Sequence, residues 1–473
     1  MTHVDTVIRG GLVVTPRGSF AADIAVREGV IRAIGRDLDM PAGTNVIDVS
    51  GLTVMPGVID PHSHLWEAGF MSGPDFTDST ASAAAGGITT VIDMPLTVPE
   101  VLDANLLRDK AILGRRTSYV DFALHGGVSP DCFGELVGMW RAGCTAFKIF
   151  TCDTGCRMAG VIEDADLLDA LTIIGSFGGL ATFHAENNGL LISNLARLTK
   201  EGRTDNRAFT EWRNETVELE AINRILFYAR RTGTRVNIVH VTSPEGVAMV
   251  HRARAMGVDA TAETCPHYLY LTEDDIAERG AWVTCAPPMR GRNAMGHMRE
   301  LVASGEIVTV GSDHGPVDPA LKQRGSNNIL NGQPGLPGNE TMVPLMLNLA
   351  AEGLLTLERL AELTAEAPAR LYGIYPRKGA IAIGSDADFT VVDAGHAWTI
   401  LQEHLIGKAG WTPYEGLSVR GRVAKTIIRG RVVAEEGRIA GETGHAAFIP
   451  RTDSTAVDGD GLHDLRPAVV TRQ

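Results

Sequence analysis

The chain has 473 residues, of which 44% are hydrophobic and 21% are charged, a composition typical of a folded globular protein. Its net charge is −14, and the sequence contains no cluster of lysine and arginine residues. We therefore do not expect it to bind nucleic acid. The first residues lack a basic segment followed by an apolar one, and no window approaches about 18 uncharged apolar residues, which predicts a cytoplasmic protein without a membrane span. Six cysteines in so long a chain predict reduced thiols rather than a disulfide framework.

Short β-branched runs broken by glycine occur near both ends of the chain. They lie at residues 6–14, 24–31, 387–393 and 426–433. Runs of this kind are typical of paired strands and turns. The sequence therefore predicts one small antiparallel β domain, a β-sandwich assembled from both termini, over residues 1–53 and 376–450.

Apolar runs and helical stretches alternate in the middle of the chain, over residues 54–375. The expected strands are residues 89–94, 120–124, 146–150, 180–183, 236–241 and 307–310. The clearest expected helices are residues 103–116, 216–232, 244–256 and 356–364. Repeated strand–helix units predict an α/β fold, a (β/α)8 barrel of the TIM type, with its active site at the carboxyl ends of the strands. The polar residues 451–473 are expected to form a packing arm or a loosely ordered tail.

Ionisable side chains recur where the apolar runs end. His62 and His64 follow the apolar run 52–59, and alternate side chains of an extended strand point the same way, so both imidazoles can bind one metal ion. Further candidates are Lys148, His184, His240 and Asp313. Because all of them fall at one end of the predicted barrel, we expect a single hydrolytic centre with two metal ions.

Each of these residues also has a structural interpretation. The histidines could be satisfied core residues, and Asp313 could cap a loop. Lys148 could form a buried ion pair; alternatively, burial near metal lowers its pKa, and the free amine takes up CO2 to become a carbamate. Asp60 could orient an imidazole ring or belong to the turn.

Several further segments are similar in sequence to a known family. They are residues 84–95, 264–269, 285–290 and 384–388. Together with the order of the candidate ligands, they resemble the amidohydrolase superfamily, specifically the cyclic amidohydrolases, which include allantoinases, hydantoinases, dihydropyrimidinases and dihydroorotases. The resemblance covers about residues 4–450.

The resemblance implies a binuclear metal centre, most simply of zinc, with manganese or cobalt as alternatives. It implies that a carbamate on Lys148 bridges two metal ions whose other ligands are His62, His64 and Asp313 for one and His184 and His240 for the other. Asp313 would accept a proton from the attacking water and return it to the departing ring nitrogen. A cyclic amide would open to a linear ureido acid. Related proteins also suggest a homotetramer or homodimer.

The resemblance implies that Ala286 and the loop 334–340, which contains Gly335, hold the cyclic imide edge of the substrate. His314, beside the expected base, either contacts the substrate or caps its own loop. A non-catalytic scaffold and hydrolysis of an ester or phosphoester are the alternatives from other functional classes, and the filled ligand positions disfavour the scaffold.

Two further positions bear on which ring is opened. Trp66 stands where dihydroorotases usually carry an arginine, and Asp153 stands where D-hydantoinases and dihydropyrimidinases usually carry a tyrosine. Both differences disfavour these relatives. Residues 94–97, 265–267 and 285–288 are similar to allantoinases and L-type hydantoinases, which is the preferred branch, although allantoinases commonly carry an asparagine where Trp66 stands. Trp66 either packs under its loop or faces an apolar substituent of the substrate, so allantoin and 5-substituted hydantoins both stay open, with dihydropyrimidinase or dihydroorotase activity as the alternative.

Overall fold

The computed structural model describes residues 4–38, 41–66, 74–154 and 160–452, and its centre is a parallel barrel. The barrel strands are β6 (Val58–Ser63), β7 (Ile88–Asp93), β8 (Asp121–Leu124), β9 (Gly126–Gly127), β10 (Phe147–Phe150), β11 (Leu180–His184), β12 (Arg235–Ile238), β13 (Ala260–Thr264) and β14 (Thr309–Val310). Only His125 separates β8 from β9, so these two strands act as one stave of an eight-staved barrel. A parallel bridge between Ser63 and His314 closes the ring between β6 and the end of β14.

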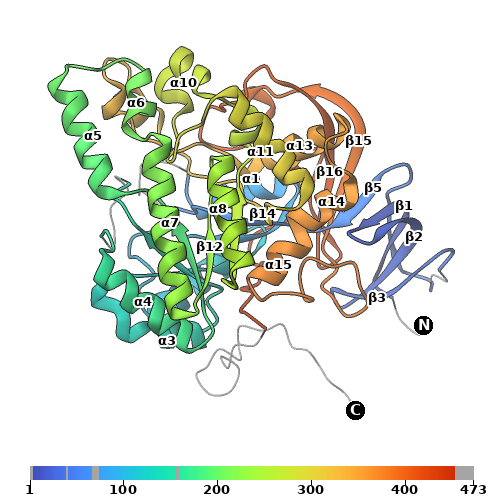
Figure 1. Cartoon of the computed structure of the whole chain (residues 1–473). Helices are drawn as coiled ribbons and strands as arrows, with labels where there is room; N and C mark the ends of the chain where they lie inside the picture. The colour runs from blue at the N-terminus through green and yellow to red at the C-terminus, as the bar shows by residue number, and fades with distance from the viewer. Residues whose placement is uncertain (1–3, 39–40, 67–73, 155–159, 453–473) are drawn as a thin grey trace.

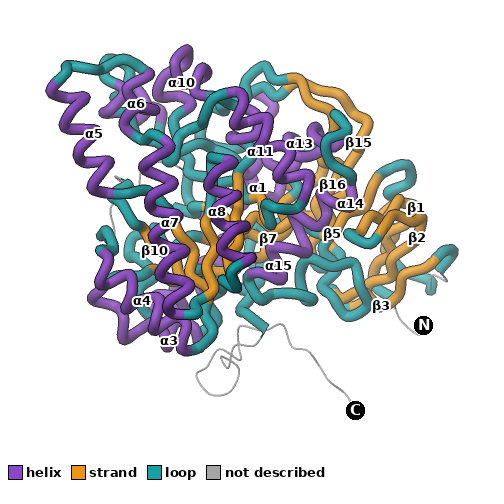
Figure 2. The backbone as a smooth tube through the Cα atoms, viewed as in Figure 1, coloured by secondary structure: helices purple, strands orange, loops and turns teal. Residues whose placement is uncertain are grey.

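Helices lie outside the strands, as Figures 1 and 2 show. The helices of the first half are α1 (Phe76–Ala85), α2 (Ala104–Thr117), α3 (Leu136–Arg141), α4 (Asp164–Ser176), α5 (Asn188–Lys200), α6 (Arg207–Trp212) and α7 (Glu215–Thr232). Those of the second half are α8 (Pro244–Ala255), α9 (His267–Tyr270), α10 (Glu273–Arg279), α11 (Arg292–Ser304), α12 (Pro319–Gln323), α13 (Asn339–Ala351), α14 (Leu357–Ala361) and α15 (Ala367–Leu371). This arrangement confirms the predicted (β/α)8 barrel, and each expected barrel strand is present with its ends shifted by three residues or fewer.

Helix α7 illustrates why these segments form helices where they do. Its first turn carries Glu215 and Glu218 and its last turn Arg230 and Arg231, which matches the charge preference of the helix dipole. Gly233 ends the helix with a φ of 71°, a left-handed conformation that glycine adopts without steric cost. The buried residues recur at helical spacing, so one face of α7 packs on the barrel.

The two ends of the chain meet in one nine-stranded sheet beside the barrel, seen next to α14 and α15 in Figure 1. Its strands are β1 (Thr6–Thr15), β2 (Gly18–Arg27), β3 (Val30–Gly35), β4 (Asn45–Asp48), β5 (Thr53–Pro56), β15 (Phe389–Thr399), β16 (Ser418–Ile428), β17 (Arg431–Glu435) and β18 (Arg438–Ile439). The expectation of a purely antiparallel domain is corrected, because β1 pairs in parallel with β4 and β5. Tight hairpins force antiparallel pairing, whereas β4 and β5 reach β1 through longer connections.

Other expectations from the sequence meet the structure as follows. The five cysteines that the structure describes are free, and Cys156 lies outside the described residues. So does the expected tail, apart from its first residues Arg451 and Thr452. Within the described part of the chain, no helix has both the length and the apolar character needed to cross a membrane.

A buried charge network joins the terminal sheet to the barrel at the amino end of β8. The Nζ atom of Lys378 contacts the carboxylates of Asp121, Asp386 and Asp388. Its distance to Oδ2 of Asp386 is 3.0 Å. Arg429, just after β16, also pairs with Asp121. Burial raises the pKa of Asp121, but the charges of Arg429 and Lys378 outweigh burial and lower it below its usual value. The carboxylate of Asp121 is therefore neutralised by cations rather than by a proton.

Replacing the central cation of this network should destabilise the protein. In Lys378→Met the buried carboxylates keep their negative charges with one cation fewer, and breaking a buried pair in this way costs about 3–5 kcal/mol of unfolding free energy. Urea denaturation should show a midpoint shifted to lower urea. Lys425→Met removes a partly exposed pair with Glu435 within the same sheet and should cost less than about 1 kcal/mol. Equal shifts for the two variants would contradict the prediction.

Candidate metal-dependent active site

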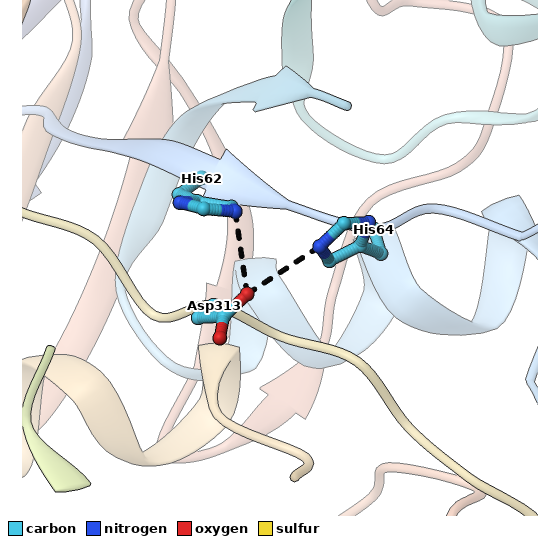
Figure 3. Close-up of side chains that lie close together, drawn as sticks. All are labelled: His62, His64 and Asp313. Carbon is cyan, nitrogen blue, oxygen red and sulfur yellow. Dashed lines mark ion pairs between the residues drawn. The ribbon is translucent and has the colours of Figure 1, made fainter. Parts of the chain in front are cut away.

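Two histidines and an aspartate converge at the carboxyl end of the barrel. His62 lies in β6 and His64 just beyond it, and Nε2 of each ring lies close to Oδ1 of Asp313, at 3.3 Å and 3.4 Å respectively. Figure 3 shows the carboxylate of Asp313 reaching toward both rings. The side chain of His62 is fully buried, and those of His64 and Asp313 are 11% and 13% exposed. Three ligand-type atoms directed at one point suit a metal ion.

The carboxylate of Asp60 links the two backbone segments that carry His62 and Asp313. Its Oδ1 accepts hydrogen bonds from the backbone N–H of His62 at 3.2 Å and of Ser312 at 2.9 Å. The Ser312 hydroxyl donates to the other carboxylate oxygen. Asp60 thus binds the turn rather than an imidazole ring, and it ties β6 to the loop that carries Asp313.

A second group of candidate ligands lies beside the first. His184 ends β11 and His240 follows β12, and Nδ1 of His184 lies 3.0 Å from Nε2 of His240. The rings of His62 and His240 have centroids 5.3 Å apart, which joins the two groups. Lys148 projects from β10; its Nζ is buried without a hydrogen-bond partner among the described residues. Burial lowers the pKa of Lys148 to about 8, against the opposing charges of Asp313 and Glu263.

Two of these residues have a strained backbone. His240 has a φ of 43° and Asp313 a φ of 47°, in the left-handed region that side chains other than glycine rarely adopt. Such a conformation costs about 1–3 kcal/mol and persists only where the surroundings enforce it. Both lie just beyond the end of a barrel strand, so the strain turns their side chains into the site.

The protonation states match what a metal ion requires. Burial lowers the pKa of His62, His184 and His240, so these rings are neutral and keep a lone pair. Burial raises the pKa of Asp313, but the hydrogen bond and charge of His64 outweigh it, and the group stays a carboxylate. Neutral imidazoles and one carboxylate form a donor set that fits divalent metal ions.

Two buried carboxylates that the sequence did not reveal orient the candidate ligands. Oε1 of Glu263 in β13 lies 2.9 Å from Nδ1 of His62. Oε2 of Glu186 lies 2.8 Å from Nε2 of His184, and Arg213 pairs with the same oxygen. Such partners fix the ring orientation of metal-binding histidines. The available signal was a charged residue within an apolar run, which Glu263 provides, but the sequence does not say what it contacts.

A cavity with about 570 Å³ of empty space opens above the histidines. It is lined by His62, His64, Trp66, Leu96, Lys148, Phe150, Thr154, His184, His240, Cys285, Ala286, Asp313, Gly315, Val317, Pro334 and Gly335. The structure therefore brings all six candidate ligands and three expected substrate contacts, Trp66, Ala286 and Gly335, around one space. Trp66 stacks on His64 with ring centroids 5.2 Å apart, and its Nε1 donates to the carbonyl of Pro316.

The other two expected substrate contacts lie elsewhere. Asp153 is exposed, and its backbone N–H donates to the side chain of Asn188 at 3.2 Å. His314 is buried beside a neighbouring cavity, where its Nδ1 accepts a hydrogen bond from the N–H of Gly338 at 3.1 Å. Neither residue lines the cavity above the histidines, so their roles in substrate binding remain predictions.

The fold and the site define a class of protein, a (β/α)8-barrel enzyme with a candidate metal site at the carboxyl ends of its strands. Residues 53–433 match the model of the amidohydrolase family. The chain is 37% identical to an allantoinase of Rubrobacter xylanophilus, over 93% of this chain and 96% of that protein. It is 34% identical to an L-hydantoinase of Paenarthrobacter aurescens, over 96% and 99% respectively.

Solved structures agree with these relatives. The L-hydantoinase (dihydropyrimidinase) from Arthrobacter aurescens superposes with a TM-score of 0.92 at 33% identity, covering 95% of this chain and all of the other. A D-hydantoinase superposes with a TM-score of 0.87 at 33% identity, covering 94% and 99%. The chain belongs to the amidohydrolase family, within its cyclic amidohydrolases, and is a hydrolase of cyclic amide C–N bonds.

Removing the carboxylate that orients His62 should weaken metal binding. Glu263→Ala leaves the imidazole free to rotate, and loss of such a partner typically lowers metal affinity about 10–100-fold. Competition with a chelator would measure the change. Glu340→Ala serves as the control, because Glu340 is largely buried but bonds the backbone of Ile406 and Gly407 instead of a histidine. A similar loss of affinity in both variants would point to general destabilisation.

Proposed function

We propose that this protein opens a five-membered ureide ring, that of allantoin or of a 5-substituted hydantoin, to a linear ureido acid. The observation that carries the proposal is the single cavity in which Asp313, the candidate histidines and Lys148 face the expected substrate contacts Ala286 and Gly335. Relatives named allantoinase and L-hydantoinase, which align over nearly the whole chain, support the same reaction.

The residues that would hold two metal ions divide into two sets joined by Lys148. The first set is His62, His64 and Asp313, and the second is His184 and His240. Two bound divalent ions, most simply zinc, supply a water of lowered pKa and polarise the substrate carbonyl. A carbamate on Lys148 would contribute two oxygens to the centre. In support, the Nζ atom of this lysine is buried and has no hydrogen-bond partner in the part of the chain that the structure describes.

Asp313 is the proton carrier of the proposed reaction. It is a carboxylate in the resting site because its pKa is lowered, so it can accept the proton of the attacking water as the carbon–oxygen bond forms. The ring carbon–nitrogen bond then breaks, and Asp313 returns the proton to the departing nitrogen. Water is consumed, no electrons are exchanged, and the carboxylate is regenerated.

Four apolar side chains of the cavity lining, which we call the apolar wall, favour a substrate with an apolar substituent. Trp66, Leu96, Phe150 and Val317 all line this space. The single polar donor of the Trp66 indole is already bonded to the carbonyl of Pro316. An aromatic substituent would therefore find an apolar contact surface there, which favours a 5-substituted hydantoin, whereas the allantoinases among the relatives favour allantoin.

Hydrolysis of allantoin and of racemic 5-benzylhydantoin by metal-replete enzyme tests the proposal. We expect turnover of at least one of them, with Lys148→Ala inactive because it lacks the residue that joins the two ligand sets. Preference for benzylhydantoin would assign the apolar wall to substrate recognition, and preference for allantoin would make Trp66 a packing residue. If neither ring opens while metal is bound, the proposal fails.

Trp66→Ala tests the apolar wall directly. If the indole contacts the substituent, kcat/KM for benzylhydantoin should fall about tenfold, the size expected for loss of an apolar contact in a pocket. The rate for unsubstituted hydantoin should change less, because that ring has no substituent to reach the wall. Equal losses for both substrates would instead indicate that Trp66 supports His64.

Replacing the proton carrier should slow the chemical step. Asp313→Asn keeps the shape of the side chain but cannot accept a proton, and kcat should fall about 10²–10⁴-fold. Metal content must be measured in the same samples, because Asp313 is also a candidate ligand. Asp259→Asn alters an exposed aspartate that pairs with Arg235 and provides the matched control. A native kcat in Asp313→Asn would exclude the proposed role.

A further inference from the structure

A second cluster of metal-type ligands lies beside the candidate centre and shares Asp313 with it, whereas its other two members have no part in the proposed reaction. Cys265, His267 and Asp313 each offer one ligand atom, and these three atoms lie within 4.8 Å of one another. Cys265 and His267 follow the end of β13, and Asp313 follows β14. Since β13 and β14 pair in parallel, the turns beyond them lie side by side, and the fold itself brings the three side chains together.

The surroundings of His267 are a second observation that points to a ligand at this cluster. His267 is only 2% exposed, and its Nε2 has no hydrogen-bond partner among the described residues. Burial lowers the pKa of His267 to about 4, so the ring is neutral at physiological pH. A neutral imidazole retains a lone pair for a metal ion.

Cys265 gives the cluster a soft ligand, its thiol sulfur. Its residue is fully buried, and burial raises the pKa of the thiol, which is therefore protonated before any metal binds. A zinc or cadmium ion would displace this proton to solvent as the metal–sulfur bond forms, without any change in oxidation state. One thiolate, one imidazole and one carboxylate suit zinc or cadmium and disfavour magnesium or calcium.

We propose that Cys265, His267 and Asp313 form an inhibitory site for an additional soft divalent ion, such as excess zinc or cadmium. The site shares Asp313 with the candidate catalytic centre. Asp313 also connects this second site to the catalytic cavity, because Asp313 lines that cavity. An ion held there engages the carboxylate that the proposed reaction uses to carry a proton, so it should inhibit without displacing the histidines.

Cadmium titration of the metal-replete enzyme tests this site. We expect a thiolate-to-cadmium absorption band in the ultraviolet that saturates at one added equivalent and disappears in Cys265→Ser. Cys144→Ser is the matched control, because Cys144 is also fully buried but lies before β10, outside the cluster. A band that persists in Cys265→Ser, or that is lost instead in Cys152→Ser beside His184, would overturn the proposal.

Two further measurements keep the test decisive if Cys265→Ser misfolds. X-ray absorption at the cadmium edge of the cadmium-bound native protein should show one sulfur ligand and several lighter ligands. A cadmium coordination shell without sulfur would refute the site. His267→Gln should weaken cadmium binding about 10–100-fold, judged from the band itself. These readouts do not depend on substrate, so they stand or fall separately from ring opening. Inhibition by cadmium, relative to each variant's own rate, should follow the same order.

Discussion

Closure of the barrel between its first and last strands is the constraint on which the candidate site depends. Asp60 within β6 accepts hydrogen bonds from the backbone N–H of both His62 and Ser312, and the N–H of His64 donates to the carbonyl of His314 at 2.8 Å. Residues about 250 positions apart in the chain are thereby held within contact distance. Gly311 belongs to the same junction, because a Cβ there would lie 2.8 Å from Cβ of His62.

Burial then sets the chemistry of the residues that this junction gathers. Taking imidazoles out of water keeps them neutral, whereas nearby charges and hydrogen bonds keep Asp313 ionised. Glu263 and Glu186 add fixed hydrogen-bond partners behind two of the rings. Among the residues that the structure describes, the buried Lys148 has no counter-charge in hydrogen-bond contact, a costly arrangement for an ammonium group. That cost disappears when the lysine side chain loses its positive charge.

The sequence predicted the barrel and the strand-end positions because both follow from local periodicity. Alternation along a strand places His62 and His64 on one side, and the apolar runs locate the strand ends. Lateral contacts between strands carry no such signal, so the pairing of Glu263 with His62 was not predicted. The parallel pairing of β1 with β5 was missed for the same reason, since it depends on connections of several residues rather than on a turn motif. The left-handed backbone of His240 is enforced by its surroundings.

The terminal sheet also has a consequence for the order in which the protein is made. One side of β5 pairs with β1, which precedes it, but the other side pairs with β15, beginning at Phe389. The ribosome therefore releases every strand of the barrel before the partner of β5 exists. Throughout that interval β5 presents an open strand edge, the kind of surface that pairs with other chains. Nascent chains of this protein are thus exposed to mispairing until nearly the whole polypeptide has emerged.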